Sequence, residues 1–155
     1  MSIAIRRFHH DDPPLLFDIF QQAVRLSAAF DYSPTQINAW AEVDRAAWIE
    51  HLRRLAPWVA EIDGVIAGYA DLQPDGYIDH FFVTARFGRR GVGSLLMQAL
   101  EQQARGQGFP LLYANVSLTA RPFFAHHGFT LLAQQTVSLR GADLINFRMN
   151  KALKS

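Results

Sequence analysis

The most informative stretch of this chain is Val83-Thr-Ala-Arg-Phe-Gly-Arg-Arg-Gly-Val-Gly-Ser-Leu-Leu-Met-Gln-Ala-Leu100. Its pattern indicates the end of a strand, a short turn rich in Arg and Gly, and an amphipathic helix. That order brings several unpaired backbone N–H groups and the positive end of a helix dipole to one point. The stretch therefore predicts a binding site for a ligand that carries phosphate.

Composition limits the classes of protein that this chain can belong to. Its 155 residues are half hydrophobic, which suits one globular domain over residues 1–155 with a substantial core. The net charge is only +1, so we expect no nucleic-acid partner. The absence of cysteine excludes disulfides, thiolate zinc sites and a cysteine nucleophile. The N-terminus has no apolar signal core and no apolar run is long enough to span a bilayer, so we expect a cytoplasmic protein without a membrane partner.

Helix and strand patterns follow one another along the chain without a repeat or a linker, which predicts one mixed α/β domain. Asp12-Pro13 and Ser33-Pro34-Thr35-Gln36 are helix-start signals, with Asp12 as a capping carboxylate and a capping box in the second. Asp63-Gly64 between two strand patterns predicts a hairpin. Further strands are expected at 77–83, 111–116, 129–139 and 144–149, and further helices at 91–105 and 120–127.

Spacing narrows the kind of phosphate loop. A P-loop needs a Lys followed by Ser or Thr directly after its last Gly, and the stretch has none. A dinucleotide fingerprint needs G-x-G-x-x-G, whereas this chain has Gly88-x-x-Gly91-x-Gly93, with the spacings reversed. Two common phosphate loops are therefore disfavoured.

The remaining pattern, Arg89-Arg90-Gly91-x-Gly93-Ser94, resembles the acetyl-CoA-binding motif Q/R-x-x-G-x-G/A of the GNAT (GCN5-related) N-acetyltransferases. Gly88 occupies the first position, where the family usually has Gln or Arg. This departure loses a side chain but keeps the backbone N–H groups that would hold a pyrophosphate. The spacing thus points to this family with one weakened position.

A second segment carries the same resemblance. Residues 120–129, Ala-Arg-Pro-Phe-Phe-Ala-His-His-Gly-Phe, are similar to the F-[YF]-x-x-x-G-F segment of these enzymes. The resemblance covers the chain from roughly Val59 to its end. Ser33-Pro34-x-Gln36-Ile37-x-Ala39-Trp40, together with Arg140-Gly141-Ala142 and Asn146-Phe147, is further similar to a YafP-like bacterial subgroup.

The resemblance implies the α/β (α+β) fold of acyl-CoA N-acyltransferases. In that fold a central, mixed and mostly antiparallel sheet of six to seven strands is flanked by helices, with a parallel pair of strands at the cofactor cleft. It implies an enzyme, a monomer or homodimer, that moves an acetyl group from acetyl-CoA to a primary amine of a small molecule or peptide. Two alternatives stay open: a non-catalytic acyl-CoA-binding or regulatory module, and an unrelated nucleotide-phosphate binder.

The resemblance also implies which residues bind the cofactor. The backbone of Phe81, Phe82 and Val83 would pair with the pantetheine arm, and Ser117 aligns with a position that is often an Asn touching the cofactor. The pyrophosphate would be wrapped by Arg89, Arg90, Gly91, Val92, Gly93 and Ser94. Phe124, beside the cofactor, occupies the place where many members have the Tyr that protonates the leaving thiolate. No acid can be named in its stead: Tyr113 is a distant candidate, and water or unassisted departure are the others.

Catalytic and acceptor-binding residues are expected around the strand at 77–83. Alternation places Tyr77 and Asp79 on one face and His80 on the other, unless a bulge intervenes. We expect Asp79 to be the general base, directly or through water, with Tyr77 lining the pocket. Alternatively, Asp79 is a structural carboxylate paired with an Arg. His80 is expected to be a packed or hydrogen-bonded histidine.

Without cysteine, direct transfer in a ternary complex is favoured over an acetyl-enzyme, with an intermediate on serine as the alternative. Phe30, Tyr32 and Trp40 are candidate contacts for the acceptor, with core packing as the alternative. No metal is expected, because the pairs His9-His10 and His126-His127 lack metal-ligand spacing.

Overall fold

The structure is a computed structural model that describes residues 2–87 and 91–153. Gly88, Arg89 and Arg90 lie outside the described residues, so the roles predicted for the two arginines stay predictions. The described helices are α1 (Pro13–Gln22), α2 (Pro34–Ala41), α3 (Arg45–Leu55), α4 (Val92–Gly106) and α5 (Arg121–His126), with short helical turns at Ala23–Ser27, Ala28–Phe30 and Ala85–Phe87. The described strands are β1 (Ile3–Arg6), β2 (Trp58–Ile62), β3 (Val65–Ala70), β4 (Tyr77–Ile78), β5 (Phe81–Val83), β6 (Leu111–Ser117), β7 (Thr130–Leu139) and β8 (Ala142–Ala152).

The described strands form two four-stranded sheets, in the orders β1-β2-β3-β5 and β4-β6-β8-β7. All pairs are antiparallel except β4 with β6, which is the expected parallel pair. The mixed, mostly antiparallel α+β fold is therefore confirmed. The sequence predicted one continuous central sheet, but the strand expected over 77–83 divides into β4 and β5.

The division has a local cause. Oδ1 of the buried Asp71 accepts the backbone N–H groups of Asp79 at 3.0 Å and of His80 at 2.6 Å. Two amide groups that a continuous strand would give to a neighbouring strand are thus bound by a side chain. The chain leaves the second sheet after β4 and enters the first sheet as β5.

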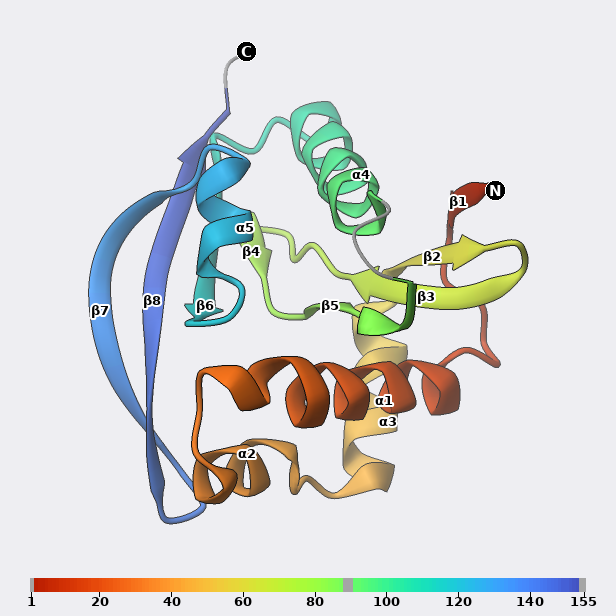
Figure 1. Cartoon of the computed structure of the whole chain (residues 1–155). Coiled ribbons are helices and arrows are strands. Elements are labelled where there is room, and N and C mark those ends of the chain that lie inside the picture. The colour runs from red at the N-terminus through yellow and green to blue at the C-terminus, as the bar shows by residue number, and fades with distance from the viewer. Residues whose placement is uncertain (1, 88–90, 154–155) are drawn as a thin grey trace.

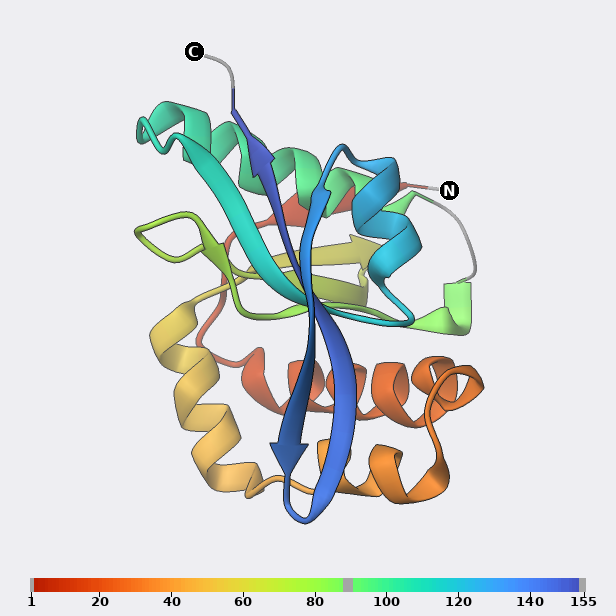
Figure 2. The same cartoon turned by 90° about the vertical axis from the view of Figure 1, so that its left-hand side faces the viewer.

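Helices cover both faces of the first sheet. α4 packs against β1, β2 and β3, whereas α1 contacts β3 and β5 and also packs on α3. Figures 1 and 2 show α4 on one side of this sheet and α1 with α3 on the other. The long, curved β7 and β8 stand beside these layers, and α2 lies against β8 (Figure 1). The largest apolar cluster includes Ala60, Ile78, Leu96, Met97, Leu100, Leu112, Phe147 and Met149.

Two local signals in the sequence are confirmed. The Gln36 N–H donates to Ser33 Oγ at 3.2 Å, and the Ser33 N–H donates to Gln36 Oε1 at 2.8 Å, which completes the capping box of α2. Asp63 and Gly64 have φ values of 50° and 84°, so the turn between β2 and β3 has the two left-handed residues of a type I′ hairpin. Both signals act within four residues, where the sequence determines the geometry directly.

Asp12 differs from its prediction. It occupies the N-cap position of α1, but its own φ and ψ are helical and its side chain makes no capping bond. The carboxylate instead accepts two hydrogen bonds from the Arg6 guanidinium, both at 2.9 Å, and the His9 N–H at 2.7 Å. The Arg6 guanidinium offers two charged donors at the end of β1, so its hydrogen bonds to Asp12 link β1 to the start of α1.

We expect Asp12→Asn to lower the free energy of unfolding by about 1.5–3 kcal/mol at neutral pH, the range for hydrogen bonds to charged groups. Burial acts to raise the pKa of Asp12, but the hydrogen bonds from Arg6 and His9 outweigh it and hold the pKa below its usual value. A lowered folded-state pKa contributes stability above the unfolded-state pKa of about 3.9 and loses it as the pH falls further. Urea unfolding across acid pH should therefore show the wild type and the variant converging below that value; a constant difference would contradict the ion pair.

Candidate functional site

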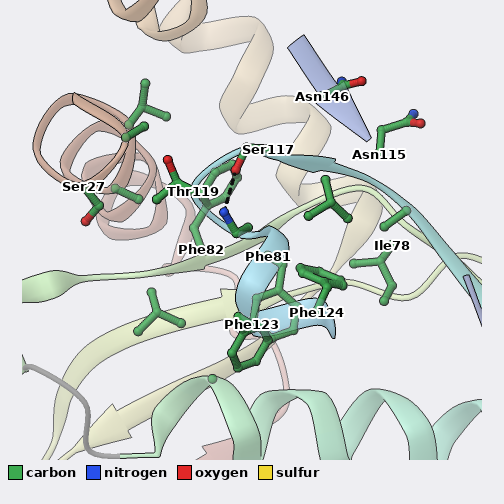
Figure 3. Close-up of a pocket in the computed structure, with 18 of the residues that line it drawn as sticks. Ser27, Ile78, Phe81, Phe82, Asn115, Ser117, Thr119, Phe123, Phe124 and Asn146 are labelled. Atoms are coloured by element: carbon green, nitrogen blue, oxygen red, sulfur yellow. Dashed lines mark hydrogen bonds between the residues drawn. The ribbon is translucent and has the colours of Figure 1, made fainter. Parts of the chain in front are cut away.

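A cleft of about 1000 Å³ opens where the two sheets part. β4 pairs with β6 only at Tyr77–Tyr113 and Ile78–Ala114, after which the chain crosses to β3. β6 continues along β8 to Ser117, and β4 no longer covers its other edge. Figure 3 shows the cleft between β5 and the end of β6, with the aromatic side chains of α5 pointing into it. Of the predicted site residues, the cleft is lined by Tyr32, Trp40, Tyr77, Asp79, Phe81, Phe82, Val83, Gly91, Val92, Gly93, Ser94, Ser117 and Phe124.

One edge of β5 faces this cleft with its backbone. The His80 carbonyl accepts the Asp71 N–H at 3.1 Å, and the Thr84 N–H donates to the Ala67 carbonyl at 2.9 Å, so these groups point toward β3. Because hydrogen-bonding directions alternate along a strand, the amide and carbonyl groups of Phe81 and Val83 point the other way. The cleft therefore presents a strand edge to which an extended ligand can bind.

The first turn of α4 forms the next part of the cleft. Gly91 is the N-cap with a left-handed φ of 87°, and its carbonyl accepts the Leu95 N–H at 3.1 Å. The N–H groups of Val92, Gly93 and Ser94 belong to the first turn and have no acceptor within the helix. A Cβ on Gly93 would lie 2.9 Å from Cε1 of Phe123, so a side chain there would require the Phe123 ring to shift. The arrangement concentrates donors and a positive dipole at one wall of the cleft.

Aromatic rings from β5 and α5 close the middle of the cleft. Phe81 packs against Phe123 and Phe124, with ring centroids 5.2 and 5.5 Å apart. Phe124 is 3% exposed and has no group that could donate a proton. This wall is suited to exclude water from a bound ligand rather than to exchange protons with it.

Ser117, the predicted cofactor contact, and Tyr113, the distant candidate for the general acid, differ in position. Ser117 lines the cleft at the end of β6, where its Oγ accepts the Ala120 N–H at 3.0 Å (Figure 3, dashed line). Tyr113 does not line the cleft; its hydroxyl donates to Asp75, and the residue lines a separate hollow of about 400 Å³. Tyr113 is therefore not placed to protonate a group in the cleft.

Asp79 lies at the break between β4 and β5, next to two histidines. Its Oδ2 is 3.0 Å from Nε2 of His51 on α3 and 3.7 Å from Nε2 of His80. The partner of Asp79 in the described structure is thus a histidine and not the arginine of the alternative interpretation. Burial raises the pKa of the neighbouring Asp71 to about 6.

His80 is packed and hydrogen-bonded, as expected. Its Nδ1 lies 3.2 Å from the Tyr69 hydroxyl, and its ring centroid is 5.0 Å from that of Trp48. Burial lowers the pKa of His80 to about 4, against the opposing charge of Asp79, so the imidazole is neutral at neutral pH. The sequence does not identify His51, because only the fold brings α3 next to the break between β4 and β5.

The candidate acceptor contacts separate into two groups. Tyr32 and Trp40 line the cleft with ring centroids 5.6 Å apart, whereas Phe30 is 91% exposed and is not among the lining residues. The Tyr32 hydroxyl donates to the Ile145 carbonyl at 2.6 Å and accepts the Leu118 N–H at 2.9 Å. Tyr32 therefore joins the helical layer to the ends of β6 and β8 while its ring faces the cleft.

Amide side chains that the sequence did not indicate form another part of the cleft lining. Asn115 Nδ2 approaches the Tyr77 hydroxyl at 3.4 Å. Gln135 Nε2 donates to Asn115 Oδ1 at 3.1 Å and to Asn146 Oδ1 at 2.9 Å. Tyr77, Asn115 and Asn146 all line the cleft, so this end of it is polar and uncharged apart from Asp79.

Comparison with known proteins identifies the family. The model of the acetyltransferase (GNAT) domain matches residues 28–151. The chain belongs to the GNAT family. It is 38% identical over 148 residues to the uncharacterised N-acetyltransferase YafP of Escherichia coli strain K12, covering 96% of this chain and 95% of YafP, which confirms the similarity to a YafP-like subgroup.

Solved structures agree with this assignment. A GCN5-related N-acetyltransferase from Rhodopseudomonas palustris superposes with a TM-score of 0.92 at 33% identity, over 99% of this chain and 97% of that one. The yncA protein of Salmonella typhimurium, solved with its cofactor acetyl-CoA, superposes with a TM-score of 0.71 at 25% identity, over 100% and 96% of the two chains. This chain is accordingly an acetyltransferase, and the alternatives of a non-catalytic module and of an unrelated nucleotide binder are set aside.

Among the described helices, none combines the length and the apolar character that crossing a bilayer requires.

Proposed function

We propose that this chain transfers the acetyl group of acetyl-CoA to a primary amine of a small molecule or peptide, by direct attack in a ternary complex. The observation that supports this most is that β4 pairs with β6 whereas β5 pairs with β3, which leaves a cleft between β5 and β6. The first turn of α4 lines this cleft, and so does Asp79 at the break before β5. A strand edge, a cluster of backbone donors and a carboxylate thereby line one cleft.

The cleft fits the chemistry of acetyl-CoA. The pantetheine arm is an extended chain with amide groups, and the backbone of Phe81 and Val83 presents donors and acceptors along one edge. The pyrophosphate is an anion, and the start of α4 offers unpaired N–H groups with a positive dipole. One neighbour, yncA, was solved with acetyl-CoA as its cofactor.

Catalysis in this cleft depends first on alignment. Bound acetyl-CoA supplies a thioester carbonyl and a thiolate leaving group. Backbone groups of β5 and the first turn of α4 fix this donor, and the facing rings of Phe81, Phe123 and Phe124 exclude water from it. Holding both reactants in one geometry can supply up to ~7–11 kcal/mol of barrier reduction in ideal cases.

Proton removal is the proposed role of Asp79. Asp79 lines the cleft at the break between β4 and β5, and its carboxylate is held by His51 at 3.0 Å. It accepts a proton from the acceptor amine, directly or through one water. With the positive charge removed, the amine has a lone pair for attack.

Departure of the thiolate proceeds without a tyrosine at the usual position. Phe124 has no proton to donate, and Tyr113 is engaged with Asp75 outside the cleft. We propose that water protonates the thiolate or that it leaves unassisted. A general acid is typically worth ~10²–10⁴-fold, so this enzyme is expected to be slower than relatives with tyrosine there.

The acceptor is proposed to enter between the helical turns that follow α1, α2 and the ends of β6 and β8. Tyr32 and Trp40 offer apolar ring surface on one side, and Tyr77, Asn115 and Asn146 offer hydrogen-bonding groups on the other. An amine that carries an apolar or aromatic part beside polar groups matches this lining. Phe30 is left out of this proposal because it lies outside the cleft lining.

The test measures initial rates of thiol release while acetyl-CoA and the amine are both varied. The amine panel contains small aromatic amines, peptides with a free N-terminus and lysine peptides. Direct transfer predicts intersecting double-reciprocal lines for the amine that is used. Parallel lines would instead indicate an acetyl-enzyme, and binding of acetyl-CoA without acceleration by any amine would contradict the proposed acceptor class.

A further inference from the structure

Three metal-ligating side chains meet beside the cleft, although they are separated in the sequence. His51 comes from α3, and Asp79 and His80 form the break between β4 and β5. One ligand atom from each residue lies within 4.8 Å of the other two. Two imidazoles and one carboxylate are a combination that binds divalent transition metals, Zn²⁺ in particular.

The spacing of these atoms fits a tetrahedral ion. At Zn–N and Zn–O distances of about 2.0–2.2 Å, neighbouring ligand atoms of a tetrahedral site lie roughly 3.3–3.5 Å apart. Asp79 Oδ2 is 3.0 Å from His51 Nε2 and 3.7 Å from His80 Nε2, which bracket that value. The His51 side chain is 38% exposed, so solvent reaches this side of the cluster.

The cluster also has a supporting shell. Asp71 holds the backbone N–H groups of Asp79 and His80 with one oxygen, which fixes both residues at the break. The Tyr69 hydroxyl lies 3.2 Å from His80 Nδ1, and its oxygen can accept a hydrogen bond from Nδ1–H, which leaves Nε2 free to ligate. Metal-bound histidines characteristically have such a partner on the second ring nitrogen.

We propose that His51 Nε2, Asp79 Oδ2 and His80 Nε2 form a binding site for one divalent transition metal ion, best matched by Zn²⁺. The fourth position is open to water, because the Asp79 side chain is 30% and the His51 side chain 38% exposed. A bound ion would replace the direct contact between His51 Nε2 and Asp79 Oδ2, which lie 3.0 Å apart.

The site has a consequence for activity, which rests on the proposed function. The carboxylate that would ligate the metal is the group that we propose as the proton acceptor, and a bound cation lowers its tendency to take up a proton. Metal binding and proton removal from the amine therefore exclude each other. Zn²⁺ is expected to inhibit acetyl transfer over the same concentration range in which it binds.

The test measures Zn²⁺ binding to the chelator-treated full chain, in competition with a chromogenic chelator and without acetyl-CoA. The wild type is expected to bind one equivalent, and His51→Gln to bind about tenfold more weakly or worse. His10→Gln removes an exposed histidine outside the cluster and should bind as the wild type does. Co²⁺ should give the visible absorption of a tetrahedral site in the wild type but not in His51→Gln.

A second variant tests the supporting shell, because Tyr69→Phe keeps the ring and removes only the hydroxyl. It is expected to weaken Zn²⁺ binding by about tenfold. The proposal is overturned if the wild type takes up no Zn²⁺, or if His51→Gln binds it as tightly as the wild type. Binding that leaves acetyl transfer unaffected would support the metal site and would argue against Asp79 as the proton acceptor.

Discussion

Asp79→Asn is expected to lower kcat by ~10²–10⁴-fold, the usual contribution of a general base. The asparagine keeps the size of the side chain and an oxygen that can accept a hydrogen bond from His51 Nε2, which lies 3.0 Å from Asp79 Oδ2. It loses the ability to take up the proton of the amine. Because no donor-binding role is proposed for this side chain, KM for acetyl-CoA should stay near the wild-type value.

Steady-state kinetics with both substrates varied measure this division between kcat and KM. Asp11→Asn is the matched control, since the same change is made at a carboxylate that is 84% exposed and away from the cleft. The control should retain wild-type kcat. If Asp79→Asn keeps kcat within a few fold, Asp79 is not the base; a rise in KM for acetyl-CoA at unchanged kcat would indicate a donor-binding role instead.

The elements that could be predicted from the sequence are those with a local physical cause. The capping box at Ser33 and Gln36 and the hairpin at Asp63 and Gly64 form within a few residues, and both have the expected geometry. Asp12 shows the limit of such signals. Its carboxylate accepts two hydrogen bonds from the Arg6 guanidinium instead of capping α1. The residues around Pro13 give no sign of this contact.

The site was less accessible to prediction, because most of its geometry is produced by tertiary contacts. The sequence pattern predicts one continuous strand over 77–83. In the structure, buried Asp71 divides this segment by accepting two of its N–H groups. His51 comes from a helix with no local signal for a site, so the pairing with Asp79 could not be anticipated. Phe30 was grouped with Tyr32 and Trp40 by its sequence position, but the short helical turn at Ala28–Phe30 leaves it exposed.

The largest expected effect on donor binding comes from Gly93→Val. A Cβ at this position would lie 2.9 Å from Cε1 and 3.1 Å from Cζ of Phe123, so the ring must move. The ring cannot move freely, because its centroid lies 5.2 Å from that of Phe81 and 4.5 Å from that of His127. Phe123 lines the cleft in which the pantetheine arm is proposed to bind, so a shifted ring would change the space available to that arm. Since misplacement by about 1 Å can cost ~10²-fold, kcat/KM for acetyl-CoA is expected to fall by roughly that factor.

Gly106→Val in the last turn of the same helix is the matched control. A Cβ built on Gly106 meets no atom within 4 Å, and its φ is not left-handed. The control should therefore bind acetyl-CoA as the wild type does, whereas Gly93→Val should bind it more weakly in a direct titration. Thermal unfolding of both variants separates a lost ligand contact from a lost fold. Equal affinities in a folded Gly93→Val protein would mean that the donor does not use the groove beside Phe123, and the proposed course of the pantetheine arm along β5 would have to be abandoned.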